Sequence, residues 1–80
     1  MEDKTVFRMQ FGAVFQRFRK EAGVSQERLS EIANVDRAYI SDIERGASSP
    51  TIEMLFTLSK GIGVSPVEII TECVDQKNTD

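Results

Sequence analysis

The sequence predicts an all-α fold, a compact bundle of five short helices in one domain over residues 1–80. Apolar side chains recur three and four residues apart, as on one face of a helix, and the alternation typical of strands is absent. Residues that start and end helices divide the chain into five such segments. The 80 residues, 40% hydrophobic and 29% charged, suffice for one small core. We expect this core over about residues 7–74 and a frayed tail over residues 75–80.

The first helix is expected to run from near Thr5 to Gly23, because glycine readily adopts the left-handed backbone of a helix end. Its apolar residues recur on one face, and we predict that this whole face is core. These residues are Phe7, Phe11, Val14, Phe15, Phe18 and Ala22.

Two shorter helices are expected at residues 26–33 and 37–45. Ser25 and Asp36 are suited to cap their N-termini. Asn34 suits the sharp turn between them, because asparagine tolerates a left-handed backbone. Two helices of about eight residues joined by about three residues follow the helix-turn-helix plan.

The fourth helix is expected over about residues 51–60, with Ile52, Leu55 and Leu58 facing the core. Gly61 is expected to end it, because glycine costs about 1 kcal/mol relative to alanine inside a helix.

The fifth helix has a capping box, Ser65-Pro66-Val67-Glu68, and is expected to end near Val74. Ile69 serves the core, and the other apolar residues exceed what the core needs. We therefore predict a homodimer through this helix and the end of the fourth. The residues expected at the dimer interface are Val67, Ile70, Cys73 and Val74.

The composition argues against catalytic and metal sites. The chain has no histidine and one cysteine, Cys73, so it has neither a zinc-binding Cys/His set nor a nucleophile paired with histidine. We predict a non-enzyme without a metal, cofactor or small-molecule ligand. The sequence shows no run of about 18 apolar residues that could span a membrane and no signal peptide, so we expect a cytoplasmic protein.

The net charge is −3, but it is unevenly distributed. Residues 7–46 hold seven basic and six acidic side chains, whereas residues 47–80 hold two basic and five acidic ones. A polyanion such as DNA should therefore meet the N-terminal half.

Four segments resemble those of a known family. They are Gly23-Val24-Ser25-Gln26-Glu27-Arg28-Leu29, Ala33-Asn34-Val35, Tyr39-Ile40-Ser41-Asp42-Ile43-Glu44-Arg45-Gly46 and Pro50. Their order and spacing resemble the phage-repressor and Cro-like helix-turn-helix family, of the xenobiotic-response-element type. The resemblance covers about residues 11–70 and implies a five-helical, usually dimeric regulator of transcription at two-fold symmetric operators. The stretch 36–41 is similar to restriction–modification controller proteins and also to other stand-alone repressors.

The resemblance implies that residues 37–45 form the helix that enters the DNA major groove. Arg37 is best placed to read a base, because a guanidinium pairs bidentately with guanine. Asp42 is open to two roles, accepting from a cytosine amine or repelling phosphate. The residues expected to contact DNA are Ser25, Gln26, Asp36, Arg37, Ala38, Tyr39, Ser41, Asp42, Arg45, Ser48 and Ser49.

Two further contacts follow from the resemblance. Gln26, whose helix N-terminus suits a phosphate, is expected to brace Arg37. Arg19 is expected to form a structural ion pair with Glu44, which lies close to the core side of its helix.

Two functions stay open at this point. The first is a sequence-specific regulator that binds a double-stranded DNA operator as a homodimer. The second is a protein-interaction module or antitoxin that keeps the fold and acts through a protein partner, which the acidic net charge favours.

Overall fold

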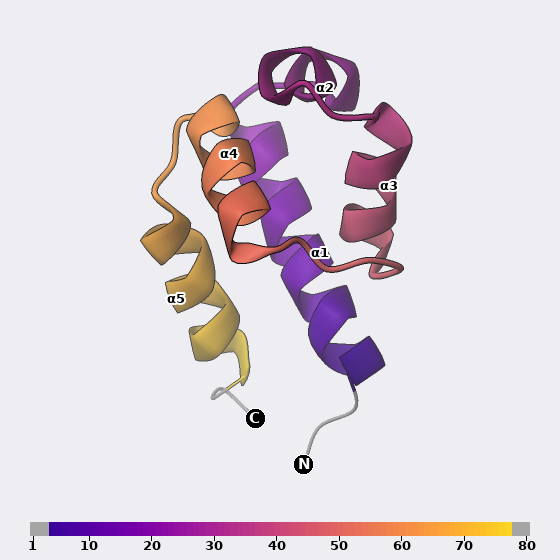
Figure 1. Cartoon of the computed structure of the whole chain (residues 1–80). Coiled ribbons are helices and arrows are strands. Elements are labelled where there is room, and N and C mark those ends of the chain that lie inside the picture. Colours follow the sequence, from indigo (N-terminus) through magenta and orange to yellow (C-terminus); the bar gives the residue numbers. More distant parts are fainter. Residues whose placement is uncertain (1–3, 78–80) are drawn as a thin grey trace.

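The structure, a computed structural model, describes residues 4–77 and has five helices (Figure 1). They are α1 (Lys4–Glu21), α2 (Gln26–Ala33), α3 (Arg37–Arg45), α4 (Ile52–Ile62) and α5 (Pro66–Lys77). No strand occurs among these residues, so the all-α prediction is confirmed. None of the five helices is long and apolar enough to cross a membrane.

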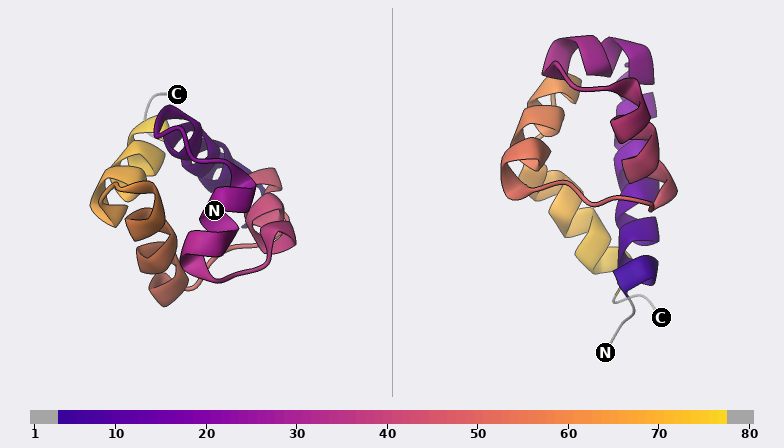
Figure 2. Two further views of the ribbon diagram at one scale, coloured as in Figure 1. Left: turned by 90° about the horizontal axis from the view of Figure 1, so that it is seen from above. Right: turned by 45° about the vertical axis from the view of Figure 1, so that its right-hand side comes forward.

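The long helix α1 organises the bundle. It packs against α3 on one side and α5 on the other, whereas α2 packs against α3 and α4. Figure 2 shows α2 lying across one end of the bundle, while the first turn of α1 and the last turn of α5 lie at the opposite end. In the helix-turn-helix, α2 therefore covers one end of the bundle and α3 packs along α1.

All five helices contribute to one core. Its fully or almost fully buried side chains are Phe11, Val14, Phe15, Leu29, Ile40, Ile43, Leu58, Ile62, Ile69 and Cys73. Burying apolar surface in this way is the main stabilising contribution to so small a domain.

The predicted caps of the helix-turn-helix are confirmed. Ser25 Oγ accepts from the Arg28 N–H at 2.9 Å, and Asp36 Oδ1 accepts from the Ala38 N–H at 3.0 Å. Asn34 ends α2 in the left-handed region, with φ of 56°. These local contacts fix where α2 begins and ends and where α3 begins.

The predicted apolar face of α1 is only partly core. Phe7 is 48% exposed and Ala22 is exposed, so both expectations were wrong. The first turns of α1 extend past the loop between α3 and α4 (Figure 1), which leaves Phe7 beyond the core. Ala22 follows the last helical residue.

The fourth helix differs from prediction at both ends. Ile52, expected to face the core, is 73% exposed because it lies directly after the N-cap residue Thr51, outside the packed turns. Gly61 does not end the helix. A Cβ at Gly61 would lie 2.6 Å from the Leu29 Cδ1, so glycine lets α2 and α4 approach, and the left-handed end falls at Gly63.

The fifth helix is longer than predicted. It continues to Lys77, past the residues expected to be frayed from Asp75 onward. The rest of that expected tail, residues 78–80, lies outside the described residues.

Candidate nucleic-acid interface

An ion pair between Arg19 of α1 and Glu44 of α3 lies beneath the candidate interface. The two side chains are only 7% and 1% exposed. Arg19 Nε donates to Glu44 Oε2 at 2.6 Å and Nη2 donates to Oε1 at 3.0 Å, while Nη1 donates to the Val24 carbonyl oxygen at 2.8 Å. Gly12 permits the close helix crossing, since a Cβ there would lie 2.4 Å from the Ile43 carbonyl oxygen. The pair expected from the sequence is thus formed.

Two glutamines also donate to Glu44 Oε1, Gln16 of α1 at 3.2 Å and Gln26 of α2 at 2.9 Å. Burial by itself raises the pKa of Glu44. The hydrogen bonds from Arg19 and Gln26, the charge of Arg19 and the hydrogen bond from Gln16 outweigh burial, so the pKa lies below its ordinary value. The buried carboxylate is therefore ionised at neutral pH.

The side chain of Gln26 connects this buried cluster to the surface. Its Nε2 faces Glu44, and its Oε1 accepts a hydrogen bond from Arg37 Nη1 at 3.0 Å. Arg37 is the first residue of α3 and is exposed. The contact between Gln26 and Arg37 that the resemblance implies is present.

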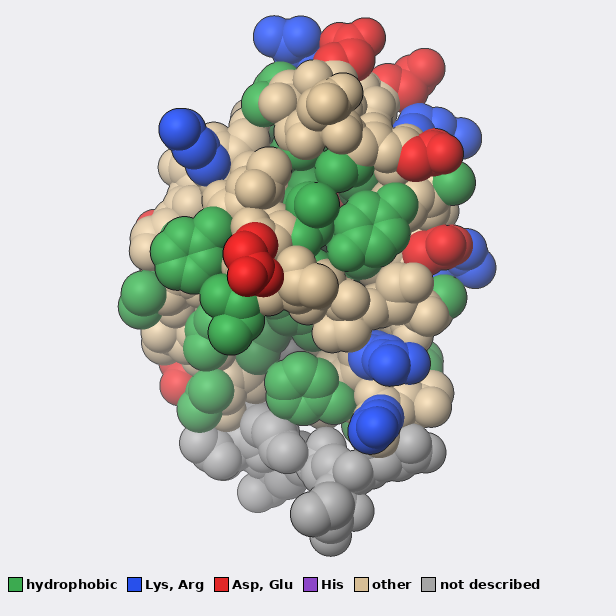
Figure 3. All heavy atoms as spheres, viewed as in Figure 1, with side chains coloured by type: hydrophobic (Ala, Val, Ile, Leu, Met, Phe, Trp, Pro, Cys, Tyr) green, Lys and Arg blue, Asp and Glu red, His purple; other side chains and the backbone are tan. Residues whose placement is uncertain are grey.

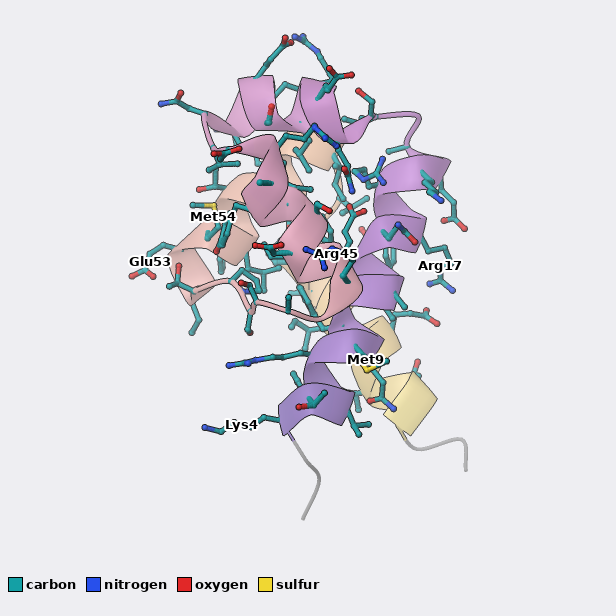
Figure 4. All side chains as sticks on the ribbon, turned by 90° about the vertical axis from the view of Figure 1, so that its right-hand side faces the viewer. Lys4, Met9, Arg17, Arg45, Glu53 and Met54 are labelled. Carbon is teal, nitrogen blue, oxygen red and sulfur yellow. The ribbon has the colours of Figure 1, made fainter. Side chains whose placement is uncertain are left out.

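Arg37 differs in its partner from the other arginines of α2 and α3. Arg28 pairs with Glu31 at 3.2 Å, and Arg45, labelled on α3 in Figure 4, pairs with Asp42. Arg37 instead contacts a neutral amide and has no carboxylate partner among the described residues. Its charge is therefore available to a phosphate or a base.

The remaining residues expected to contact DNA lie on α2, on α3 or in the loop after it. Exposed are Ser25, Asp36, Ala38 and Ser49, and half-buried are Tyr39, Ser41 and Ser48. The ring of Tyr39 packs against the core, so only part of it reaches the surface. Contacts of these residues with DNA stay predictions.

A second surface is apolar and lies over α5 and the start of α4, where Figure 3 shows hydrophobic side chains gathered. The end of α4, which was expected to join α5 in a dimer interface, does not line this surface. It consists of two hollows of about 210 and 320 Å³ that share Leu55 and Ile70. We call the exposed residues along them the apolar strip. They are Phe7, Ile52, Phe56, Val67, Ile70 and Val74.

Three of the four residues expected at a dimer interface, Val67, Ile70 and Val74, belong to the apolar strip. Cys73 does not, because it is only 8% exposed and forms part of the chain's own core. Burial and the nearby charge of Glu72 raise the pKa of its thiol.

Sequence reasoning missed two kinds of residue. Gln16 precedes Arg19 by three positions on the same helical face, a spacing that could have linked it to Glu44. Phe56 follows Ile52 by four positions and so shares its helical face; the expectation that Ile52 faces the core hid this exposed pair.

Comparison with known proteins finds helix-turn-helix proteins as relatives. Residues 15–69 match a family model described as helix-turn-helix. The chain is 38% identical over 60 residues to the uncharacterized HTH-type transcriptional regulator y4dJ of Sinorhizobium fredii, covering 75% of this chain and 78% of that protein. It is 34% identical over 64 residues to control protein C.BamHI of Bacillus amyloliquefaciens, covering 79% of each.

A solved structure is similar over almost the whole chain. The restriction–modification controller protein C.Esp1396I, as a tetramer in complex with its natural 35 base-pair operator, has a TM-score of 0.77 and 34% identity. The similarity covers 88% of this chain and 92% of that one.

We expect Arg19→Ala to lower the free energy of unfolding by about 2–4 kcal/mol, because it leaves the buried Glu44 charge without its main partner. Replacing Arg19 and Glu44 together by apolar residues should cost less than the sum of the single changes. Urea unfolding of the wild type, both single variants and the double variant measures this, and additive losses would contradict the coupling.

The lowered pKa of Glu44 also predicts a pH dependence. A carboxyl group whose pKa is lower in the folded than in the unfolded chain adds stability above its unfolded pKa, and this stability is lost as the pH falls through its folded pKa. Between pH 6 and about pH 3, the free energy of unfolding should therefore fall more steeply for the wild type than for Glu44→Gln. Parallel curves for the two proteins in urea unfolding would refute this.

Proposed function

We propose a sequence-specific DNA-binding function for this chain, which belongs to the helix-turn-helix family of Cro-like and phage-repressor type. In this proposal the chain is a transcriptional regulator that inserts α3 into the major groove of an operator. The observation that supports it best is the exposed Arg37 at the start of α3, held by Gln26 and without a carboxylate partner among the described residues.

The chemistry of Arg37 suits base recognition. A guanidinium donates two parallel hydrogen bonds to O6 and N7 of guanine in the major groove. The neighbouring Ala38 is small and exposed, so α3 can approach the base edges closely. The solved complex of C.Esp1396I with its operator supports a DNA partner for a relative of this size.

The apolar strip supports a homodimer as the binding species. Large exposed apolar patches on small proteins commonly mark interaction surfaces, and a second copy would cover this one by two-fold symmetry. The two α3 helices of such a dimer need to lie about 34 Å apart to meet successive major grooves.

We expect Arg37→Ala to lower affinity for a selected operator by about 1–3 kcal/mol per half-site and to relax base preference at one position in each half. The slope of affinity against salt should change little, because phosphate contacts determine most of it. Binding titrations on matched and shuffled operators at two salt concentrations measure both effects.

The matched control is Arg17→Ala, which removes the same charge from α1 at a side chain paired with Glu72. It should leave base preference unchanged. An equal loss for Arg37→Ala on matched and shuffled DNA would make Arg37 a backbone contact. A wild type without preference for any selected site would favour a protein partner instead.

We expect Ile70→Asp to raise the dimer dissociation constant at least about 30-fold, the effect of a central interface residue, and to abolish operator binding while leaving the helix content unchanged. Ile70 is 44% exposed and lines both hollows of the apolar strip. Analytical ultracentrifugation and circular dichroism measure the two quantities.

The control for this prediction is Ile32→Asp, a similarly exposed isoleucine on α2 outside the apolar strip. It should leave the wild-type association unchanged. A wild type that stays monomeric at roughly 50 µM, where a micromolar dimer is mostly formed, would argue strongly against the homodimer.

A further inference from the structure

We propose that Glu44 is a positioning residue for base recognition, because its carboxylate orients the amide of Gln26 and, through it, the guanidinium of Arg37. This inference rests on the proposed function, because it concerns how the side chain of Arg37 is oriented before it binds a base. It concerns a buried residue that does not itself reach DNA, since the Glu44 side chain is 1% exposed.

The carboxylate of Glu44 is held in one orientation by its hydrogen bonds. Its Oε2 accepts from Arg19 Nε, and its Oε1 accepts from Arg19 Nη2, Gln16 Nε2 and Gln26 Nε2. Arg19 is in turn held by the Val24 carbonyl oxygen. Rotation of the carboxylate would break several of these bonds in a buried setting, where unpaired charges are costly.

A fixed Glu44 carboxylate determines which way the Gln26 amide points. An ionised carboxylate only accepts hydrogen bonds and a guanidinium only donates them. Gln26 lies between the two, with Nε2 2.9 Å from Glu44 Oε1 and Oε1 3.0 Å from Arg37 Nη1. A flipped amide would put oxygen against carboxylate and N–H against guanidinium, and both bonds would be lost.

The Gln26 amide in turn restricts the side chain of Arg37. An exposed arginine loses many rotamers when it binds, which lowers affinity. The bond from Nη1 to Gln26 restricts these rotamers before DNA arrives and leaves Nε and Nη2 to donate to a base. Since Glu44 sets the amide and the amide holds Arg37, the buried carboxylate prepares the base-reading group.

The test uses the discrimination ratio, the affinity for the selected operator divided by the affinity for the same operator with the Arg37-dependent base pair replaced. Glu44→Gln should lower this ratio about fivefold, the effect of one ordinary hydrogen bond, because a glutamine at 44 no longer dictates the amide orientation. An unchanged ratio in a folded Glu44→Gln protein would overturn the inference.

The matched control is Gln16→Ala. It removes a hydrogen bond to the same Glu44 oxygen, Oε1, but leaves the bonds from Gln26 to Glu44 and from Arg37 to Gln26 in place. Its ratio should stay within about twofold of the wild type. An equal loss in Gln16→Ala and Glu44→Gln would assign the effect to general destabilisation and overturn the inference.

A double-mutant cycle shows whether Glu44 acts through Gln26. In the Gln26→Ala background the link is already absent, so Glu44→Gln should lower the ratio no further. A further fivefold loss in that background would mean that Glu44 acts by another route, which contradicts the proposal.

A measurement on the free wild type covers the case in which Glu44→Gln does not fold. The Gln26 side-chain amide protons should exchange with water more slowly than those of Gln10, a similarly half-buried glutamine of α1 outside the cluster, because Nε2 of Gln26 is held by Glu44. Exchange at the rate of an unbonded amide would overturn the inference.

Failure of the proposed function has a different signature. An unchanged ratio for Arg37→Ala would refute base reading by Arg37, and with it this inference. A lowered ratio for Arg37→Ala together with an unchanged ratio for Glu44→Gln would refute this inference alone.

Discussion

The buried carboxylate of Glu44 is the constraint on which the arrangement of α1, α2 and α3 depends. It belongs to α3 and accepts four hydrogen bonds from α1 and α2. A desolvated charge is costly unless such bonds are in place, so none of these helices can shift without a free-energy cost. Gly12 is part of the same constraint, because only a residue without Cβ lets α1 approach the α3 backbone closely enough. Polar burial thus contributes specificity to a domain whose apolar core is small.

An acidic protein that binds DNA must limit the repulsion between its carboxylates and phosphate. Here the carboxylates of α2 and α3 are largely occupied within the protein: Asp42 and Glu31 pair with arginines, and Asp36 caps α3. Arg37 is left with a neutral partner. Under the proposed function, few cations contribute to non-specific attraction, which grows with the number of neutralised phosphates. A larger share of the binding free energy would then depend on base contacts. Binding would therefore be sensitive to the orientation of the Arg37 guanidinium.

Local signals in the sequence predicted the helix-turn-helix well, because each depends on one residue and its neighbours. Ser25 and Asp36 cap helices and Asn34 turns the chain as expected. Predictions failed where a residue's environment is set by distant elements. Phe7 follows the helical period but lies beyond the core, and Gly61 stands inside α4, where the absence of a Cβ leaves room for Leu29 of another helix. The links from Gln16 and Gln26 to Glu44 span 28 and 18 residues. Helical spacing places Gln16 beside Arg19, but Gln26 lies on another helix and has no such local signal for its contact with Glu44.

The helix α1 connects the candidate nucleic-acid interface to the apolar strip. It has 18 residues, which at a rise of 1.5 Å per residue gives a rod of about 27 Å. Near its end, Arg19 holds Glu44 of α3, while near its start, Phe7 and Phe11 line a hollow with Ile70 of α5. In the proposed dimer the apolar strip would set how two copies of α5 meet. Because α1 packs against both α5 and α3, the way in which the two copies of α5 pack together would also fix the distance and tilt between the two recognition helices. The operator spacing would then follow from packing far from the DNA.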